Sequence, residues 1–210
     1  MNNPWLDISL SDYEAHMALP EVAQARLLAD VFAAQLEIHK PGSLAVLGCA
    51  GGNGFERIKP EITRRVVGVE LNGSYLQAVR VRFGNVFEEL ELIEGDIQVA
   101  EAVFAPVDLI YAALVLEYVE VRTAVTQACA SLNSRGVLVT VVQLPDAKLP
   151  AVTPSPFPSM KTLEAAMHFA SPMELRIYAN ANGLRQIASA TRQTPSGKQF
   201  RVQVDRKSVV

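Results

Sequence analysis

Long apolar runs, a secretion signal, paired cysteines and an excess of one charge are all missing from this sequence. Its apolar runs stay short of the roughly 18 residues that span a bilayer, so we expect no membrane partner. The N-terminus lacks the basic-then-apolar order of a signal peptide. Only Cys49 and Cys129 are present, in unrelated segments, which favours a reducing, cytoplasmic location. A formal net charge of −3 disfavours a nucleic-acid-binding function.

Metal and phosphate motifs are missing as well. The three histidines, His16, His39 and His168, have no ligand spacing with each other or with acidic residues, so we expect no metal site. The pair Gly197-Lys198 is followed by Gln199 instead of Ser or Thr, which excludes a nucleotide-binding loop of the Gly-Lys-Ser/Thr type.

Alternating strand and helix patterns fill most of the 210 residues. Short apolar runs that predict buried strands lie at 44–47, 66–70, 90–93, 107–113 and 137–142, and helical patterns separate them. Two further runs, 184–192 and 199–204, flank a Thr-Pro-Ser-Gly turn and predict a hairpin. We therefore expect an α/β fold with a doubly wound, mostly parallel seven-stranded sheet and an antiparallel C-terminal hairpin.

The chain divides into four segments of one domain, residues 1–210. Residues 1–40 predict a helical arm with helices at 13–19 and 21–39, and residues 42–143 hold the strand–helix core with a turn at 134–136. Residues 144–170 are rich in proline and end in a helix predicted at 163–169. Residues 171–210 hold the hairpin and a helix with a capping box at Ser171 and an end at Asn182-Gly183.

A glycine-rich turn is the first candidate site. The strand at 44–47 runs into Gly48-Cys49-Ala50-Gly51-Gly52-Asn53-Gly54, and a short helix begins at Phe55. Small residues at a strand-to-helix turn let a ligand approach the backbone closely, and the free N–H groups of the helix point toward it.

Two carboxylates end the next two strands. Glu70 closes the second strand, where it can accept hydrogen bonds from both ribose hydroxyls, and Asp96 follows the third, where it can accept one from an adenine amine. Parallel strands place both acids and the glycine-rich turn at one edge of the sheet. The dinucleotide pattern Gly-x-Gly-x-x-Gly fails in either register, because Ala50 and Asn53, or Arg57, stand where glycines belong. The site therefore suits an adenosine without a pyrophosphate.

Taken together, these motifs resemble the class I S-adenosylmethionine-dependent methyltransferases, from residue 42 to about residue 205. The resemblance rests on the order and spacing of these segments: 46–54, 67–70, 94–97, 107–114 with 116–119, and 132–138. It implies a Rossmann-like methyltransferase fold, S-adenosyl-L-methionine as the cofactor, and methyl transfer by in-line displacement. It also implies cofactor contacts for the following residues: Gly48, Cys49, Ala50, Gly52, Asn53, Glu70, Leu71, Asp96, Ile97, Ala112 and Tyr13.

Two residues depart from the family pattern. Val46 stands where family members often have an acid, and Ala50 replaces a glycine. The amino group of the cofactor then needs another anchor, either backbone carbonyls near Gly48 or a side chain of the N-terminal arm such as Tyr13.

The catalytic residue is not marked by a motif, because methyl transfer depends mainly on positioning the reactants. Polar candidates at the same edge or over it are Tyr13, Tyr118, Gln143, Asp146 and His168 together with the two that rank first, Glu117 and His16. Motifs for methylation of DNA bases are absent after the fourth strand and around both cysteines, which leaves a small-molecule acceptor. The arm and the Pro-rich segment would form its pocket.

Three functions stay open at this stage. The first is a methyltransferase that acts on a small molecule, and the second is an NAD-dependent oxidoreductase on a similar sheet. The third is a non-catalytic protein that binds S-adenosylmethionine. The sequence does not indicate the acceptor or the oligomeric state.

Overall fold

The computed structural model describes residues 3–99 and 104–209; positions 1–2, 100–103 and 210 of the predicted segments lie outside this part. It contains a seven-stranded sheet in the order β3-β2-β1-β4-β5-β7-β6. The strands are β1 (Ser43–Leu47), β2 (Arg65–Glu70), β3 (Glu89–Glu94), β4 (Val107–Ala113), β5 (Leu132–Gln143), β6 (Leu184–Gln193) and β7 (Gln199–Lys207). The first five pair in parallel, whereas β7 pairs antiparallel with both β5 and β6. The predicted α/β fold is confirmed.

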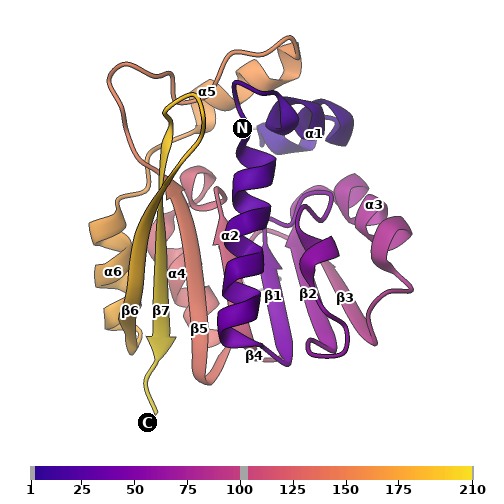
Figure 1. Cartoon of the computed structure of the whole chain (residues 1–210), viewed down its shortest axis with the longest axis vertical. Coiled ribbons are helices and arrows are strands. Elements are labelled where there is room, and N and C mark those ends of the chain that lie inside the picture. Colours follow the sequence, from indigo (N-terminus) through magenta and orange to yellow (C-terminus); the bar gives the residue numbers. More distant parts are fainter. Residues whose placement is uncertain (1–2, 100–103, 210) are drawn as a thin grey trace.

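Helices cover both faces of the sheet (Figure 1). Helices α2 (Gln24–His39) and α3 (Gly73–Phe83) pack on one face with the 3₁₀ helix η2 (Phe55–Arg57). Helices α4 (Val121–Ala130) and α6 (Pro172–Ala181) pack on the other. The central strands are apolar on both sides because both sides are covered.

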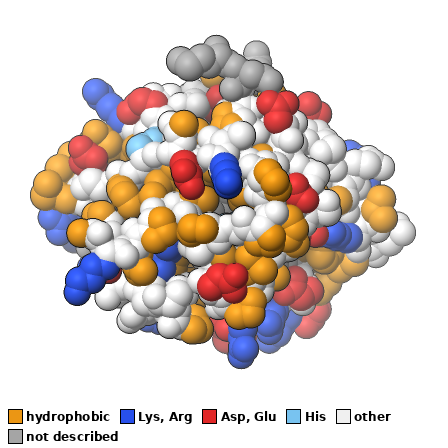
Figure 2. Space-filling view, turned by 90° about the horizontal axis from the view of Figure 1, so that it is seen from above, with side chains coloured by type: hydrophobic (Ala, Val, Ile, Leu, Met, Phe, Trp, Pro, Cys, Tyr) orange, Lys and Arg blue, Asp and Glu red, His pale blue; other side chains and the backbone are white. Residues whose placement is uncertain are grey.

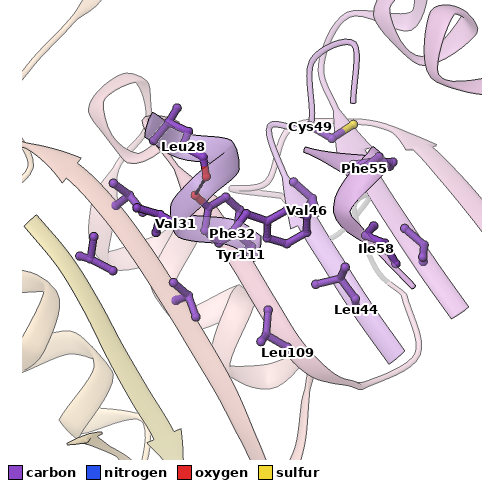
Figure 3. Close-up of a cluster of buried hydrophobic side chains, with 14 of the residues drawn as sticks. Leu28, Val31, Phe32, Leu44, Val46, Cys49, Phe55, Ile58, Leu109 and Tyr111 are labelled. Atoms are coloured by element: carbon purple, nitrogen blue, oxygen red, sulfur yellow. Dashed lines mark hydrogen bonds between the residues drawn. The ribbon is translucent and has the colours of Figure 1, made fainter. Parts of the chain in front are cut away.

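Strand β1 shows how alternation divides the core. Leu44 and Val46 join the cluster beneath α2, while Ala45 and Leu47 join the cluster beneath α4. Figure 3 shows α2 lying over β1 and β4 through Phe32 and Tyr111, and the Tyr111 hydroxyl donates a hydrogen bond to the carbonyl of Leu28 over 3.0 Å. Position 46 is therefore a core position, and the valine there fills the space.

Helix ends follow the predicted caps in the core and differ in the arm. As predicted, the Ser171 side chain accepts a hydrogen bond from the N–H of Glu174 at the start of α6, and Asn72 caps α3 in the same way. Helix α2 begins at Gln24 instead of Glu21, because Ala23 adopts a left-handed conformation with φ of 51°. The turn predicted at 134–136 lies within the span of β5, where the pairing with β4 is irregular.

The first helix and the Pro-rich segment meet over the carboxyl ends of the parallel strands (Figure 1). Helix α1 spans Leu10–Ala18, three residues longer at its start than predicted because Ser9 caps it. The predicted helix at 163–169 is shorter, η5 (Pro158–Thr162) followed by α5 (Leu163–Ala166). Figure 2 views the molecule from this end and shows hydrophobic side chains across the middle of the face, with charged ones among them. Among the described residues, no helix is both long and apolar enough to cross a bilayer.

Candidate functional site

The glycine-rich turn after β1 is held in an unusual backbone conformation. Gly48 and Gly52 have φ of 65° and 86°, and Ala50, which is not glycine, has φ of 46°. A Cβ built at Gly48 would lie 2.8 Å from Val115, so this position has no room for a side chain. The N–H of Ala50 donates a hydrogen bond to Glu70 Oε2 over 2.8 Å, which fixes the turn against the end of β2.

Glu70 is a buried carboxylate that is bound only by backbone groups in the described structure. Its Oε2 accepts the Ala50 N–H, and its Oε1 accepts the N–H of Asn72 over 3.1 Å. The side chain is 7% exposed, and burial raises the pKa of Glu70, although these backbone hydrogen bonds oppose the shift. A carboxylate has about four acceptor positions, so roughly two remain for hydroxyl donors of a ligand.

A cleft opens beside Glu70 at the carboxyl ends of the strands, and we name it the main cleft. It encloses about 640 Å³ of free space including its open mouth, a size typical of sites for small molecules. Seven of the eleven predicted cofactor-binding residues line it: Tyr13, Gly48, Ala50, Glu70, Leu71, Asp96 and Ile97. The carboxylate of Asp96 also accepts hydrogen bonds from the backbone N–H and the side chain of Gln98, which orients it.

The other four predicted cofactor-binding residues do not line the main cleft. Cys49 is buried beneath the turn, where its Sγ fits against Gly68, and Asn53 turns away to donate a hydrogen bond to the carbonyl of Ala25 over 3.0 Å. Gly52 faces the ring of Phe83. Ala112 is buried on the α4 side, and its neighbour Ala113 reaches the cleft instead.

Ten further residues line the main cleft, and of these the sequence had indicated only Tyr118 as a site residue. They are Asn3, Trp5, Val69, Tyr75, Gly95, Ala113, Leu114, Val115, Tyr118 and Val119. Alternation along β4, with even positions in the core beneath α4, was the available signal for Ala113. No local signal in the sequence marks Trp5, because it reaches the site only through the packing of the arm.

Three contacts fasten the arm over the main cleft. The Tyr75 hydroxyl donates to the carbonyl of Ile8 over 2.9 Å, and the Asn72 side chain donates to the carbonyl of Trp5 over 2.9 Å. Arg82 Nη2 donates to Glu14 Oε2 over 2.9 Å, and Arg82 Nη1 reaches the Gly51 carbonyl over 2.9 Å. The arm is therefore attached to α3 and to the glycine-rich turn.

A second cavity adjoins the main cleft under the arm. It holds about 490 Å³ of free space, including its open mouth, between α1, the segment after β4 and the Pro-rich segment. The rings of Trp5, Tyr13 and Tyr118 line both cavities, with Trp5 edge-on to Tyr13 at 5.5 Å and to Tyr118 at 5.0 Å between ring centroids. Both leading catalytic candidates, Glu117 and His16, line this second cavity.

Glu117 is the most deeply buried acid of the site. It is 1% exposed; its Oε1 accepts the N–H of Gln143 over 2.7 Å, and its Oε2 is buried without a partner among the described residues. Burial raises the pKa of Glu117 to about 7, which places its titration near neutral pH.

His16 is buried like Glu117, but burial shifts its pKa in the opposite direction. Its Nδ1 is buried without a hydrogen-bond partner in the described structure, and burial lowers its pKa, so the imidazole is neutral at pH 7. Of the other candidates, Gln143 and Tyr118 line the second cavity, whereas Asp146 and His168 are exposed and do not. The described residues contain no cluster of three or more metal-binding side chains.

Comparison with known proteins gives one family and many similar folds. Residues 45–140 match the family model of a methyltransferase domain. No curated protein sequence matches the chain. Similar solved structures include the N-methyltransferase NodS from Bradyrhizobium japonicum WM9 in complex with S-adenosyl-L-homocysteine, with 16% identity, a TM-score of 0.69, and coverage of 98% of this chain and 99% of that one.

Two further structures share the fold at low identity. The magnesium protoporphyrin IX methyltransferase from Synechocystis PCC 6803, with bound S-adenosylhomocysteine, has 12% identity, a TM-score of 0.67, and coverage of 89% of this chain and 84% of that one. The [4+2]-cyclase SpnF has 14% identity, a TM-score of 0.68, and coverage of 90% and 83%. At these identities the likeness establishes the fold.

The described residues of the main cleft suit an adenosyl group. Glu70 keeps free acceptor positions beside the cleft, and Gly48 and Ala50 expose their backbone there. The segment matched by the family model, residues 45–140, contains the glycine-rich turn, Glu70 and Asp96. Residues 45–140 therefore match a methyltransferase domain, and the chain has the Rossmann-like fold seen in methyltransferase structures.

Proposed function

We propose that the protein transfers a methyl group from S-adenosylmethionine in the main cleft to a small molecule in the second cavity. The observation that carries this proposal is the wall of Trp5, Tyr13 and Tyr118, which lines both cavities. Because the two cavities share these residues they adjoin, and an acceptor atom at their junction would lie next to the methyl group for in-line transfer.

Each part of the cofactor has candidate residues. Glu70 would accept hydrogen bonds from the ribose hydroxyls, and Asp96 with Ile97 would border the purine. The backbone at Gly48 and Ala50 would follow the chain toward the sulfonium. Since Val46 is a core residue, Tyr13 of the arm is our candidate anchor for the amino group. When bound, the cofactor supplies an activated methyl group.

The setting of the reaction is also part of the proposal. Cys49 and Cys129 are both free and buried, which is in keeping with a reducing, cytoplasmic compartment. The small second cavity and the slight acidic excess favour a small-molecule partner over a nucleic acid.

Thermal unfolding with added ligands tests the cofactor assignment. S-adenosylmethionine and S-adenosylhomocysteine at a hundredfold excess over Kd should raise Tm by about 5–10 °C, and NAD should not. Glu70→Ala and Glu70→Gln should lose most of this shift. The control is Glu94→Ala, which removes the exposed acid opposite Glu70 on β3. Stabilisation by NAD alone, or a full shift in both Glu70 variants, would overturn the proposal.

A screen of small molecules with methyl-labelled cofactor then separates an enzyme from a binding protein. Transfer of label to an acceptor supports methyl transfer. Cofactor binding without transfer to any acceptor favours the non-catalytic alternative, and the cyclase SpnF shows that this fold also serves in a protein named for another reaction.

A further inference from the structure

We propose, building on the methyltransferase function above, that the acceptor is a small amine with an apolar body and that the carboxyl of Glu117 binds its nitrogen. The starting point is a pair of side chains that lack partners. Glu117 Oε2 and His16 Nδ1 are both buried without a hydrogen bond in the described structure, and both residues line the second cavity. Unsatisfied buried polar atoms are costly, so two at one cavity indicate a ligand that satisfies them.

Apart from Gln24, Gln143, Thr153 and the two tyrosines, the rest of the second cavity is apolar. Its walls include Met17, Met160, Leu163 and Met167. Methionine side chains adapt to apolar ligands of different shapes. The acceptor is therefore an apolar molecule with one polar group, and that group has to meet Glu117 and His16.

The charge of the site decides against an acidic acceptor. Among the described residues that line the second cavity, none is a lysine or arginine. The nearby Lys198 uses its ammonium group to bind the Ala151 carbonyl and Thr153 Oγ1, both over 2.9 Å. A carboxylate ligand would thus meet the acid Glu117 without a free cation, whereas an ammonium ligand would meet that acid beside the aromatic residues Trp5 and Tyr13.

Burial distinguishes an amine from an alcohol or a phenol. In a buried site the pKa of an ammonium falls while that of a carboxyl rises, so a proton shared between the two moves readily from nitrogen to oxygen. Burial raises the pKa of a hydroxyl as well as that of the carboxyl, so a hydroxyl acceptor gains no such advantage. A buried, unpaired carboxyl therefore suits the deprotonation of an amine.

The proposed step balances as follows. The proton of the bound ammonium passes to Glu117 Oε2 and leaves a lone pair on the nitrogen. The nitrogen forms a bond to the methyl carbon as the carbon–sulfur bond breaks, and the electron pair of that bond stays on sulfur. The products are a methylated ammonium and S-adenosylhomocysteine.

The titratable groups around Glu117 predict how binding depends on pH. His16 and Tyr13 of α1 and Tyr118 of its own segment line the same cavity, and Lys198 lies near His16. Of these, Glu117 has a pKa of about 7 and Lys198 one of about 8 in the free protein, and loss of the Lys198 charge above that pH would favour an ammonium ligand further. Below the pKa of Glu117 an ammonium ligand has to displace the carboxyl proton, so affinity should rise about tenfold per pH unit and then level off.

Calorimetric titration of the protein saturated with S-adenosylhomocysteine tests the acceptor class without turnover. The probes are hexylamine, phenethylamine and tryptamine, each with its matched alcohol and carboxylate. At pH 8 at least one amine should bind ten times more tightly than its matched analogues. At pH 6, titrations in buffers of different ionisation enthalpy should show release of about one proton per amine bound.

Glu117→Gln removes the charge and keeps the shape and the hydrogen bond from Gln143. It should lose the preference for amines and the proton release, yet still bind S-adenosylhomocysteine. Glu164→Gln, at an exposed acid of α5, is the matched control and should behave as the wild type.

The outcomes separate this inference from the proposed function. If S-adenosylhomocysteine itself fails to bind, the proposed function is wrong. If it binds but no amine is preferred, or Glu117→Gln keeps the preference, the acceptor assignment is wrong and the function stands.

Discussion

Glu70 does two things at once at the centre of the site. Its two oxygens hold the N–H groups of Ala50 and Asn72, and the same carboxylate borders the main cleft. Ala50 needs such support, because a left-handed conformation in a residue with a side chain costs about 1 kcal/mol. A ligand hydroxyl bound by Glu70 would therefore be placed relative to the glycine-rich turn.

Gly48→Ala tests how tightly that turn is packed. The alanine would have to keep the positive φ of Gly48, and its Cβ would clash with Val115. We therefore expect a loss of about 1–3 kcal/mol in unfolding free energy together with loss of cofactor binding. Gly183→Ala is the matched control, because Gly183 has φ of 79° and open space around it. It should lose about 1 kcal/mol and bind the cofactor normally, as measured by urea unfolding and calorimetry. Equal cofactor binding in both variants would contradict the packing argument.

The sequence predicts the residues of the site best where they stand at the ends of strands. Gly48, Glu70 and Asp96 come from strand ends, and parallel strands bring their ends to one edge. Predictions from motif spacing alone were less specific, because neighbours such as Ala112 and Ala113 face opposite sides of the sheet. That Glu117 is buried without a second hydrogen bond depends on residues far away in the sequence, and local patterns do not contain this information.

At the scale of elements, the N-terminal arm determines access to both cavities. Helix α1 and η1 (Pro4–Leu6) supply Trp5, Tyr13 and His16, and they hold to α3 through a few hydrogen bonds. The Pro-rich segment covers the other side, where Lys198 and the side chain of Gln143 both donate to the Ala151 carbonyl.

Arg82→Met should loosen the arm without changing the cavities themselves. It removes an exposed ion pair with Glu14 and a hydrogen bond to the Gly51 carbonyl, together worth about 1 kcal/mol. We expect S-adenosylhomocysteine to dissociate about fivefold faster and amides 5–19 to exchange faster in hydrogen–deuterium exchange. Arg80→Met, an exposed position of the same helix, should change neither. Unchanged exchange in Arg82→Met would show that this contact does not hold the arm.

The helices of the arm were harder to predict than those of the core. Asn72 and Ser171 cap α3 and α6 as their sequences indicate, since a cap acts within a few residues. Pro20 favoured a helix start at Glu21, but the chain makes a further turn and Ala23 adopts a left-handed conformation before α2 begins. The start of α2 therefore depends on the packing between α1 and α2 more than on the residues of the turn.

At the scale of the whole molecule, several buried ionisable groups oppose folding near neutral pH. Burial raises the pKa of Glu117 to about 7 and that of Asp205 to about 6, and it lowers that of Lys198 to about 8. The first two groups hold a proton more tightly in the folded state, so their contribution to stability falls as pH rises from about 4 to 7. Lys198 binds its proton less tightly when folded, so stability rises again above about 8.

Unfolding in urea from pH 4.5 to pH 10 should therefore show a minimum of stability near pH 7 to 8. The contribution of Glu117 is roughly 3 kcal/mol at most. Glu117→Gln should be more stable than the wild type at pH 8 and nearly equal to it at pH 4.5, while Glu164→Gln should follow the wild-type curve. A stability that is independent of pH across this range would contradict these shifts.

The sequence predicts the class of sheet, mostly parallel with an antiparallel hairpin, but not the position of β7 within it. Parallel pairing of the first five strands follows from the helices between them. The placement of β7 between β5 and β6 depends on long-range pairing, as in Val139 with Val204. Hydrophobic alternation indicates that β6 and β7 form a hairpin, but not which of them pairs with β5.

The position of the first residues has a practical consequence for anyone who produces this protein. Asn3 and Trp5 line the main cleft, whereas β7 ends at the opposite pole of the molecule (Figure 1). Because Asn3 lines that cleft, an N-terminal affinity tag or cleavage scar would join the chain within a few residues of it. Purification handles and surface-immobilisation linkers therefore belong after Val210, and assays on N-terminally tagged material should be repeated with the tag moved.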